Sequence, residues 1–179
     1  AQYFVKAARE HHNVATPAYP LGTIVEYHND TLGGYGKCIY LRYTKGAETL
    51  AAGSPVGLLI STTITNYVVS GDQSAVALNG PTAIALSAMT TLYYGWFWCA
   101  GVCPDFSTEA GRRFADGVIT TGGNVAVGKG VYFSADNTID LLTLTGSEQS
   151  VYTSMGVALA TNSSTSLGVD ELWLAPTWG

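Results

Sequence analysis

The sequence predicts an all-β fold, either a sandwich or a barrel-like scaffold, built from two weakly repeated β units. Short segments in which apolar and polar residues alternate follow one another along most of the chain. Glycine-rich turns separate these segments, and many short strands at regular spacing are typical of sandwiches and barrels. An extended N-terminal arm precedes the first unit, and at most one or two short helices are expected.

The repeat is visible as a faint similarity between two parts of the chain at a fixed offset. Residues 57–61 (GLLIS) reappear 73 positions later, since 134 − 61 is 73, as residues 130–134 (GVYFS). At the same offset, residues 83–87 (AIALS) match residues 156–160 (GVALA). Self-similarity at one offset indicates that a supersecondary unit is used twice. The alternative is that glycine-punctuated apolar strands resemble each other by chance.

The first β unit is expected over residues 21–104. Its clearest strand is residues 37–43, where Cys38, Tyr40 and Arg42 face one way and the apolar residues between them face the other. Glycine, asparagine and proline mark the turns that separate the strands. We expect strands in this unit at residues 22–27, 37–43, 58–62, 65–69, 74–78, 83–87 and 92–99.

A connector over residues 105–116 joins this unit to the second, which covers residues 117–179. Ser107 is a favoured N-cap and Glu109 lies in the turn that follows, so the connector has room for a short helix to about Ala115. We expect strands in the second unit at residues 125–127, 130–135, 138–145, 151–159 and 167–174.

Residues 1–20 differ in composition from the rest of the chain and are interpreted as an arm. They contain His11 and His12, and a short helix over residues 2–11 would place apolar side chains on one face. Pro17 and Pro20 then favour an extended backbone. The alternative is a disordered tail.

The charge of the chain argues against several classes of partner. The chain has 13 acidic and 8 basic residues, a net charge of −5, whereas binding to nucleic acid needs clustered Lys and Arg. No apolar run reaches the roughly 18 residues of a membrane-spanning helix. Between residues 47 and 104 only Glu48 and Asp72 are charged. Such a surface suits a protein whose faces lie against other subunits, although a Thr/Ser-rich β protein can also be soluble with few charges.

The sequence contains few side chains that could act in catalysis, and no enzyme activity is predicted. The three histidines are His11 and His12 in the arm and His28 at an expected turn, and no G-x-S-x-G motif is present. A glycosidase would need two carboxylates across a cleft, and structural roles are favoured for the carboxylates of both units. The candidates are Glu26, Asp30, Asp136, Asp140, Asp170 and Glu171.

The three cysteines are Cys38, Cys99 and Cys103. An odd number fits synthesis in a reducing cytosol better than a fold held by disulfides. A zinc site would need histidine to complete its ligands, and buried thiols that act as small hydrophobic side chains are favoured. Phosphate-binding loops are absent, so neither a metal nor a cofactor is predicted.

An aromatic run at residues 93–98 is the most conspicuous apolar segment. Strand alternation places Tyr94, Trp96 and Trp98 on one face. They could form a platform for carbohydrate, but an aromatic side chain buries on the order of 150–250 Å². Packing in the core and at a subunit interface is therefore favoured. Near the C-terminus, Trp173 and Trp178 either pack on the protein itself or contact a neighbour.

The first unit contains a series of short apolar motifs: residues 80–88 (GPTAIALSA) followed by residues 94–101 (YGWFWCAG), and residues 21–25 (LGTIV) and 37–41 (KCIYL). This series resembles the capsid decoration (cement) proteins of tailed bacteriophages. The resemblance covers most of residues 21–101 and is looser over residues 117–174. These motifs are short and apolar and contain no catalytic residue.

The resemblance implies a structural protein that binds the outer surface of an icosahedral phage head and stabilises it by bridging capsid subunits. Its partners would be the major capsid protein and further copies of itself, commonly as a trimer. It would be made in the bacterial cytoplasm and end on the capsid surface of the virion. The arm and the pair Cys99 and Cys103 depart from the family pattern.

We expect the arm to reach across a neighbouring subunit and aromatic side chains to anchor the interface. The interface residues expected from sequence are Tyr3, Phe4, Arg9, Tyr19, Trp98, Trp173 and Trp178. The alternative function is a carbohydrate-binding or adhesive β module that uses the aromatic strand or the C-terminal tryptophans. A secreted hydrolase comes third, because it would need two carboxylates in an open cleft.

Overall fold

The computed structural model confirms an all-β fold. It describes residues 11–29, 33–44, 50, 53–59, 67–71, 81–86, 88–102, 130–135, 138–141, 156–158 and 172–174, and these residues contain ten strands and no helix. The strands are β1 (Ile24–Asn29), β2 (Gly34–Tyr43), β3 (Pro55–Leu58), β4 (Val68–Ser70), β5 (Thr82–Ala85), β6 (Tyr94–Val102), β7 (Gly130–Ala135), β8 (Thr138–Leu141), β9 (Gly156–Ala158) and β10 (Leu172–Leu174).

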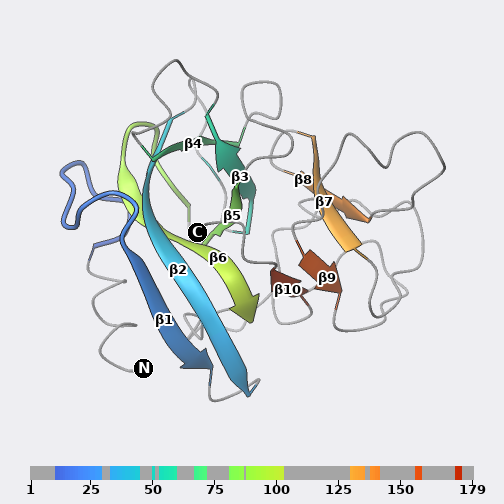
Figure 1. The fold of residues 1–179 in the computed structure, drawn as a ribbon. Helices are drawn as coiled ribbons and strands as arrows, with labels where there is room; N and C mark the ends of the chain where they lie inside the picture. The colour runs from blue at the N-terminus through green and yellow to red at the C-terminus, as the bar shows by residue number, and fades with distance from the viewer. Residues whose placement is uncertain are drawn as a thin grey trace.

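Five of these strands close into a ring. β2 pairs in parallel with β4, and antiparallel pairings then run from β4 to β3, from β3 to β5, from β5 to β6 and from β6 back to β2. β1 pairs with residues 34–39 of β2, on the edge that faces away from β6 (Figure 1). β4 pairs with Arg42 and Tyr43 farther along the same edge. The barrel-like alternative of the sequence prediction therefore describes the first unit.

The interior of the ring is filled by the apolar residues that alternate along its strands. Ile39 lies opposite Phe97 in the β2–β6 pairing, and Val56 lies opposite Ala83 in the β3–β5 pairing. The buried residues of this core are Ile39, Leu41, Tyr43, Leu50, Val56, Val69, Ala83, Ala85, Met89, Phe97 and Cys99. Because side chains in a strand alternate between two faces, Cys38, Tyr40 and Arg42 share one face, as the sequence predicts, and this face points away from the core that contains Ile39, Leu41 and Tyr43.

The remaining strands extend the sheet beyond β6. The order continues through β10, β9, β7 and β8, which lie on the far side of β6 from β2 (Figure 1). Here β7 pairs antiparallel with β9 and β9 with β10. The same order is found in the ring, where β3 pairs with β5 and β5 pairs with β6, so that β7, β9 and β10 correspond to β3, β5 and β6.

The two sets of strands correspond at the offset of the sequence repeat, with a change of register. Gly57 pairs with Thr82 in the ring. Its counterpart Gly130 pairs with Val157, which is the counterpart of Ile84 rather than of Thr82. A register change of two residues keeps each side chain on the same face of the sheet.

Some expected elements are displaced and others lie outside the described residues. The third strand is at Pro55–Leu58 rather than residues 58–62, with its proline at the first position, where a missing N–H is tolerated. β6 begins at Tyr94 rather than residue 92, because Leu92 has a left-handed backbone with φ 71°. The helices expected over residues 2–11 and 107–115 fall almost entirely outside the described residues, as do the strands expected at 74–78 and 125–127.

Candidate interaction surface

Residues 11–22, which we call the strap, cross the outer face of the aromatic strand β6. Val14 and Tyr94 exchange two backbone hydrogen bonds of 3.1 and 2.9 Å. The backbone N–H of Trp96 donates to Nδ1 of His12 at 3.3 Å, and the backbone N–H of Thr90 donates to the side-chain oxygen of Asn13 at 2.8 Å. The second half of the expected arm therefore lies on the protein's own barrel.

Tyr19 fixes the end of the strap by packing on two buried aromatic residues. Its ring centroid lies 5.4 Å from that of Tyr40 and 5.2 Å from that of Trp96. The backbone N–H of Ala18 donates to the hydroxyl of Tyr40 at 3.2 Å. Burial raises the pKa of Tyr40 above its ordinary value. Tyr19, expected as an interface anchor, thus has an intramolecular role.

Trp98 lies in the protein's own interior. Its side chain is 0% exposed, and its indole N–H donates to the carbonyl oxygen of Ala100 at 3.1 Å. Trp96, on the same face, is also buried. The preference for core packing over an open carbohydrate platform is therefore correct for these two tryptophans, and Trp98 is not available to a partner.

The other expected interface residues are placed only in part. Trp173 is in β10, where its backbone pairs with Val102 of β6, but its side chain lies outside the description. Tyr3, Phe4, Arg9 and Trp178 lie outside the described residues.

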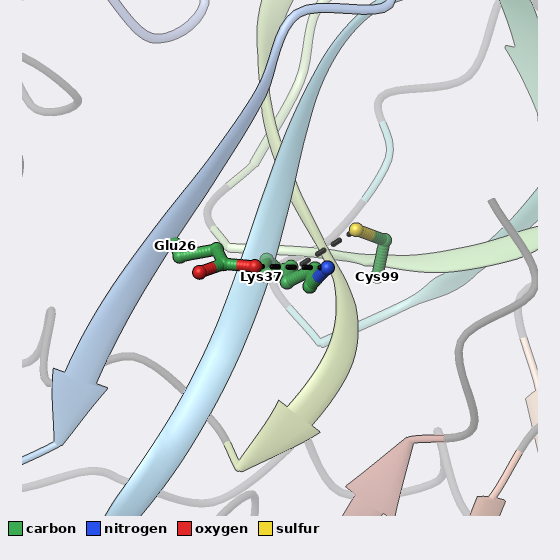
Figure 2. Close-up of polar contacts among 3 residues, drawn as sticks. All are labelled: Glu26, Lys37 and Cys99. Atoms are coloured by element: carbon green, nitrogen blue, oxygen red, sulfur yellow. Dashed lines mark hydrogen bonds and ion pairs between the residues drawn. The ribbon is translucent and has the colours of Figure 1, made fainter. Parts of the chain in front are cut away.

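A β-bulge in β6 brings Cys99 close to the β2 backbone. Lys37 pairs with Ala100 and Cys38 pairs with Trp98, so Cys99 is the extra residue. Its thiol donates to the carbonyl oxygen of Lys37 at 3.3 Å (Figure 2). Burial raises the pKa of Cys99 to about 12. Cys38 is also buried and neither residue forms a disulfide, so both pack as small apolar side chains, while Cys103 lies outside the described residues.

Lys37 and Glu26 form a cross-strand ion pair on the β1–β2 hairpin. The ammonium nitrogen lies 2.9 Å from a carboxylate oxygen, and both side chains are exposed (Figure 2). The hydrogen bond from Lys37 to Glu26, together with the negative charge of Glu26, raises the pKa of Lys37. On the same hairpin His28 packs edge-to-face against Tyr35, at 4.9 Å between ring centroids.

The candidate catalytic residues are dispersed wherever the structure describes them. His11 packs against Tyr19 in the strap, Glu26 is paired with Lys37, and Asp140 is in β8 opposite Tyr132. No group of three His, Cys, Asp or Glu residues in the described part of the chain could hold a metal ion. Asp30, Asp136, Asp170 and Glu171 lie outside the described residues.

Among the residues that the structure describes, three large apolar side chains are exposed: Tyr35 at 75%, Tyr67 at 40% and Leu92 at 51%. Tyr67 and Leu92 also have left-handed backbones, with φ 47° and 71°. Both lie in chain segments that carry no charged residue, because the described residues from 50 to 102 include no Asp, Glu, Lys or Arg. Sequence reasoning missed these two residues, since a positive φ at tyrosine or leucine leaves no compositional signal.

Comparison of the chain with known proteins does not add a relative to this picture. Within the described residues no helix is long and apolar enough to cross a membrane. Searches against protein-family models, curated proteins and solved structures each found no match.

Proposed function

We propose that this protein is a capsid decoration protein, which binds the outer surface of an icosahedral phage head as a homotrimer and bridges subunits of the major capsid protein. The observation that carries the proposal is the scarcity of charge between residues 47 and 104, where only Glu48 and Asp72 are charged, together with the exposure of Tyr67 and Leu92 there. Burying an uncharged surface against another protein involves little desolvation penalty, and exposed apolar groups are typical of interaction sites.

The N-terminal arm supplies a second attachment in this proposal. The strap fixes the chain on the barrel from His11 onward, through the Val14–Tyr94 and His12–Trp96 contacts. Residues 1–10, with Tyr3, Phe4 and Arg9, precede this fixed point and reach the neighbouring capsid subunit. Because the barrel is already bound, the contact of the arm is intramolecular and adds to occupancy through effective concentration.

The proposal leads to a truncation experiment on undecorated phage heads. Deleting residues 1–10, and not 1–20, leaves the strap over Trp96 and preserves the barrel. We expect the full chain to co-sediment with the heads and the truncated chain to lose most of its occupancy at the same concentration. Tyr35→Ser is the matched control, because Tyr35 is exposed but lies on the hairpin, outside the strap and the uncharged region.

Two results would contradict the proposal. Failure of the full chain to bind heads would refute the decoration function, and equal occupancy of the truncated chain would refute the role of the arm. The burial of Trp96 and Trp98 argues against the aromatic strand as a glycan platform, so no second function is proposed.

A further inference from the structure

Leu92 is an exposed leucine at a turn position that favours glycine. The backbone N–H of Tyr93 donates to the carbonyl oxygen of Thr90 at 3.1 Å, which makes Leu92 the third residue of the turn. A positive φ at this position is the property of a type II turn and is normally supplied by glycine or asparagine. Leu92 has φ 71° and a side chain that is 51% exposed. Its side chain therefore adds backbone strain without filling the core.

Tyr67 has the same combination of strain and exposure. Its φ is 47° and it is 40% exposed. Its ring lies on Gly22, where a Cβ atom would be 2.5–2.8 Å from the ring carbons. The strap thus provides a glycine where the ring needs room, so the orientation of Tyr67 is fixed by the fold.

These two residues flank the same end of β2. The backbone N–H of Arg42 donates to the carbonyl oxygen of Tyr67 at 3.2 Å, and the backbone N–H of Leu92 donates to the carbonyl oxygen of Tyr43 at 2.8 Å. Adjacent strands are about 4.8 Å apart, so the two residues stand roughly two strand spacings from each other, one on each side of β2. Strained residues held by their surroundings often mark functional sites.

Arg42 provides a positive charge between them. Its side chain faces outward, and its guanidinium carbon lies 5.8 Å from the centroid of the Tyr94 ring. The Nε atom is buried without a hydrogen-bond partner. No carboxylate within the described part of the chain forms an ion pair with this guanidinium, although its planar fork is well suited to bind one.

We propose that Tyr67, Leu92 and Arg42, which we call the barrel-end patch, dock an extended segment of a partner protein that carries a carboxylate beside apolar side chains. Within the described residues, Arg42 is the only charged side chain beside Tyr67 and Leu92. One arginine fits one carboxylate rather than a polyanion, because nucleic acid or phosphate surfaces need several clustered cations. Tyr67 and Leu92 supply the apolar contacts on either side. In the proposed function this partner is a capsid subunit, but the patch can be tested without it.

The direct test uses two synthetic peptides, acetyl-Ala-Leu-Asp-Leu-Ala-amide and the same peptide with Asn in place of Asp. Each is titrated into the isotopically labelled full chain while the amide resonances are followed by NMR. We expect shifts concentrated at Arg42, Tyr67 and Leu92, and a higher affinity for the Asp peptide. Absence of these shifts, or shifts centred elsewhere, would overturn the proposal.

Two variants separate the apolar and the ionic contributions. Leu92→Gly should weaken binding of both peptides by about tenfold, because burial of a leucine is lost, and the turn should keep its fold because glycine favours positive φ. Arg42→Gln should abolish the preference for Asp over Asn. Tyr35→Ser should bind both peptides as the natural chain does. Unchanged peptide binding by either of the first two variants would refute the corresponding role.

Co-sedimentation of the same variants with undecorated heads distinguishes this inference from the proposed function. If the natural chain does not bind heads, the decoration function is refuted. The peptide titration then still shows whether the barrel-end patch binds a carboxylate-bearing segment. If the natural chain binds heads and Leu92→Gly and Arg42→Gln bind equally well, the patch is not the capsid contact and the decoration function stands.

Discussion

The hydroxyl of Tyr27 donates a hydrogen bond to the carbonyl oxygen of Val102, and the side chain of Tyr27 crosses Gly36 to reach it. Gly36 lies in β2, between Tyr27 in β1 and Gly101 in β6. This contact ties the two neighbours of β2 together over its surface. It depends on the absence of a side chain at residue 36.

Gly36→Ala should destabilise the protein because the added methyl group would overlap the Tyr27 hydroxyl and the Val102 carbonyl oxygen. Overpacking of this kind typically costs about 1–3 kcal/mol, and loss of the hydrogen bond adds about 1 kcal/mol. The free energy of unfolding from urea denaturation measures the effect.

Gly33→Ala is the control for this substitution. Gly33 has φ 66° and no atom within 4 Å of an added Cβ. It should show only the cost of left-handed backbone, about 1–2 kcal/mol. A smaller effect at residue 36 than at residue 33 would contradict the close approach of Tyr27.

Tyr19→Ala should loosen the strap and expose Trp96 to water. Removal of a partly buried aromatic ring from Tyr40 and Trp96 should cost about 1–3 kcal/mol, below the 3–5 kcal/mol typical of fully buried aromatics. Tryptophan emission should shift to longer wavelength and acrylamide quenching should increase. Tyr35→Ala, at an exposed position, should leave both signals unchanged, and identical spectra for the two variants would argue against the strap contact.

Cys99 should resist alkylation in the folded protein. Its pKa is raised to about 12 from an ordinary value of 9.0, and the thiolate is the reactive form. Iodoacetamide at pH 8.5 should modify Cys99 only after denaturation, as measured by peptide mass spectrometry. Rapid modification in the folded state would show that the thiol is accessible.

The raised pKa also predicts how stability depends on pH. Above pH 9 the unfolded chain loses the Cys99 proton while the folded protein keeps it, so the unfolded state is favoured. The contribution of Cys99 to stability is complete below pH 9 and is lost as the pH rises towards about 12, with a limiting slope of about 1.4 kcal/mol per pH unit. Cys99→Ala should reduce this slope between pH 9 and 11, and an unchanged slope would assign it to other groups.

Leu92→Gly should leave the melting temperature unchanged or raise it. The left-handed backbone at φ 71° costs a leucine about 1–2 kcal/mol, which roughly offsets the greater conformational entropy that glycine loses on folding. Leu41→Gly is the contrasting variant, because Leu41 is buried in the core and its loss should be strongly destabilising. A large decrease in melting temperature for Leu92→Gly would mean that this side chain supports the fold.

The sequence correctly predicts which side chains share a face of a strand, because this depends only on their alternation along the chain. Cys38 and Tyr40 on one face, and Tyr94, Trp96 and Trp98 on one face, follow from the period of a strand and agree with the register of β2 and β6. Sequence reasoning also favoured core packing for the tryptophans. It could not show that Tyr19 covers Trp96, because that contact joins residues far apart in the chain.

Backbone conformation was the main source of error. Tyr67 and Leu92 have positive φ values and are hydrogen-bonded to Arg42 and Tyr43 at the end of β2. Neither residue type favours such a conformation, so local propensity predicts strand there. Strand propensity therefore predicts the start of β6 two residues too early and gives no indication that Tyr67 and Leu92 are exposed.

Closure of the ring sets an order for folding. Cys38 and Trp98 are paired although 60 residues separate them in the chain, and contacts between such distant residues form slowly because the intervening segment must first be confined. A nascent chain that ends before β6 leaves one edge of β2 without its partner, and an unpaired edge can pair with other chains. Chains truncated within residues 94–102 should therefore aggregate. In the completed ring β6 pairs with this edge of β2 and covers it.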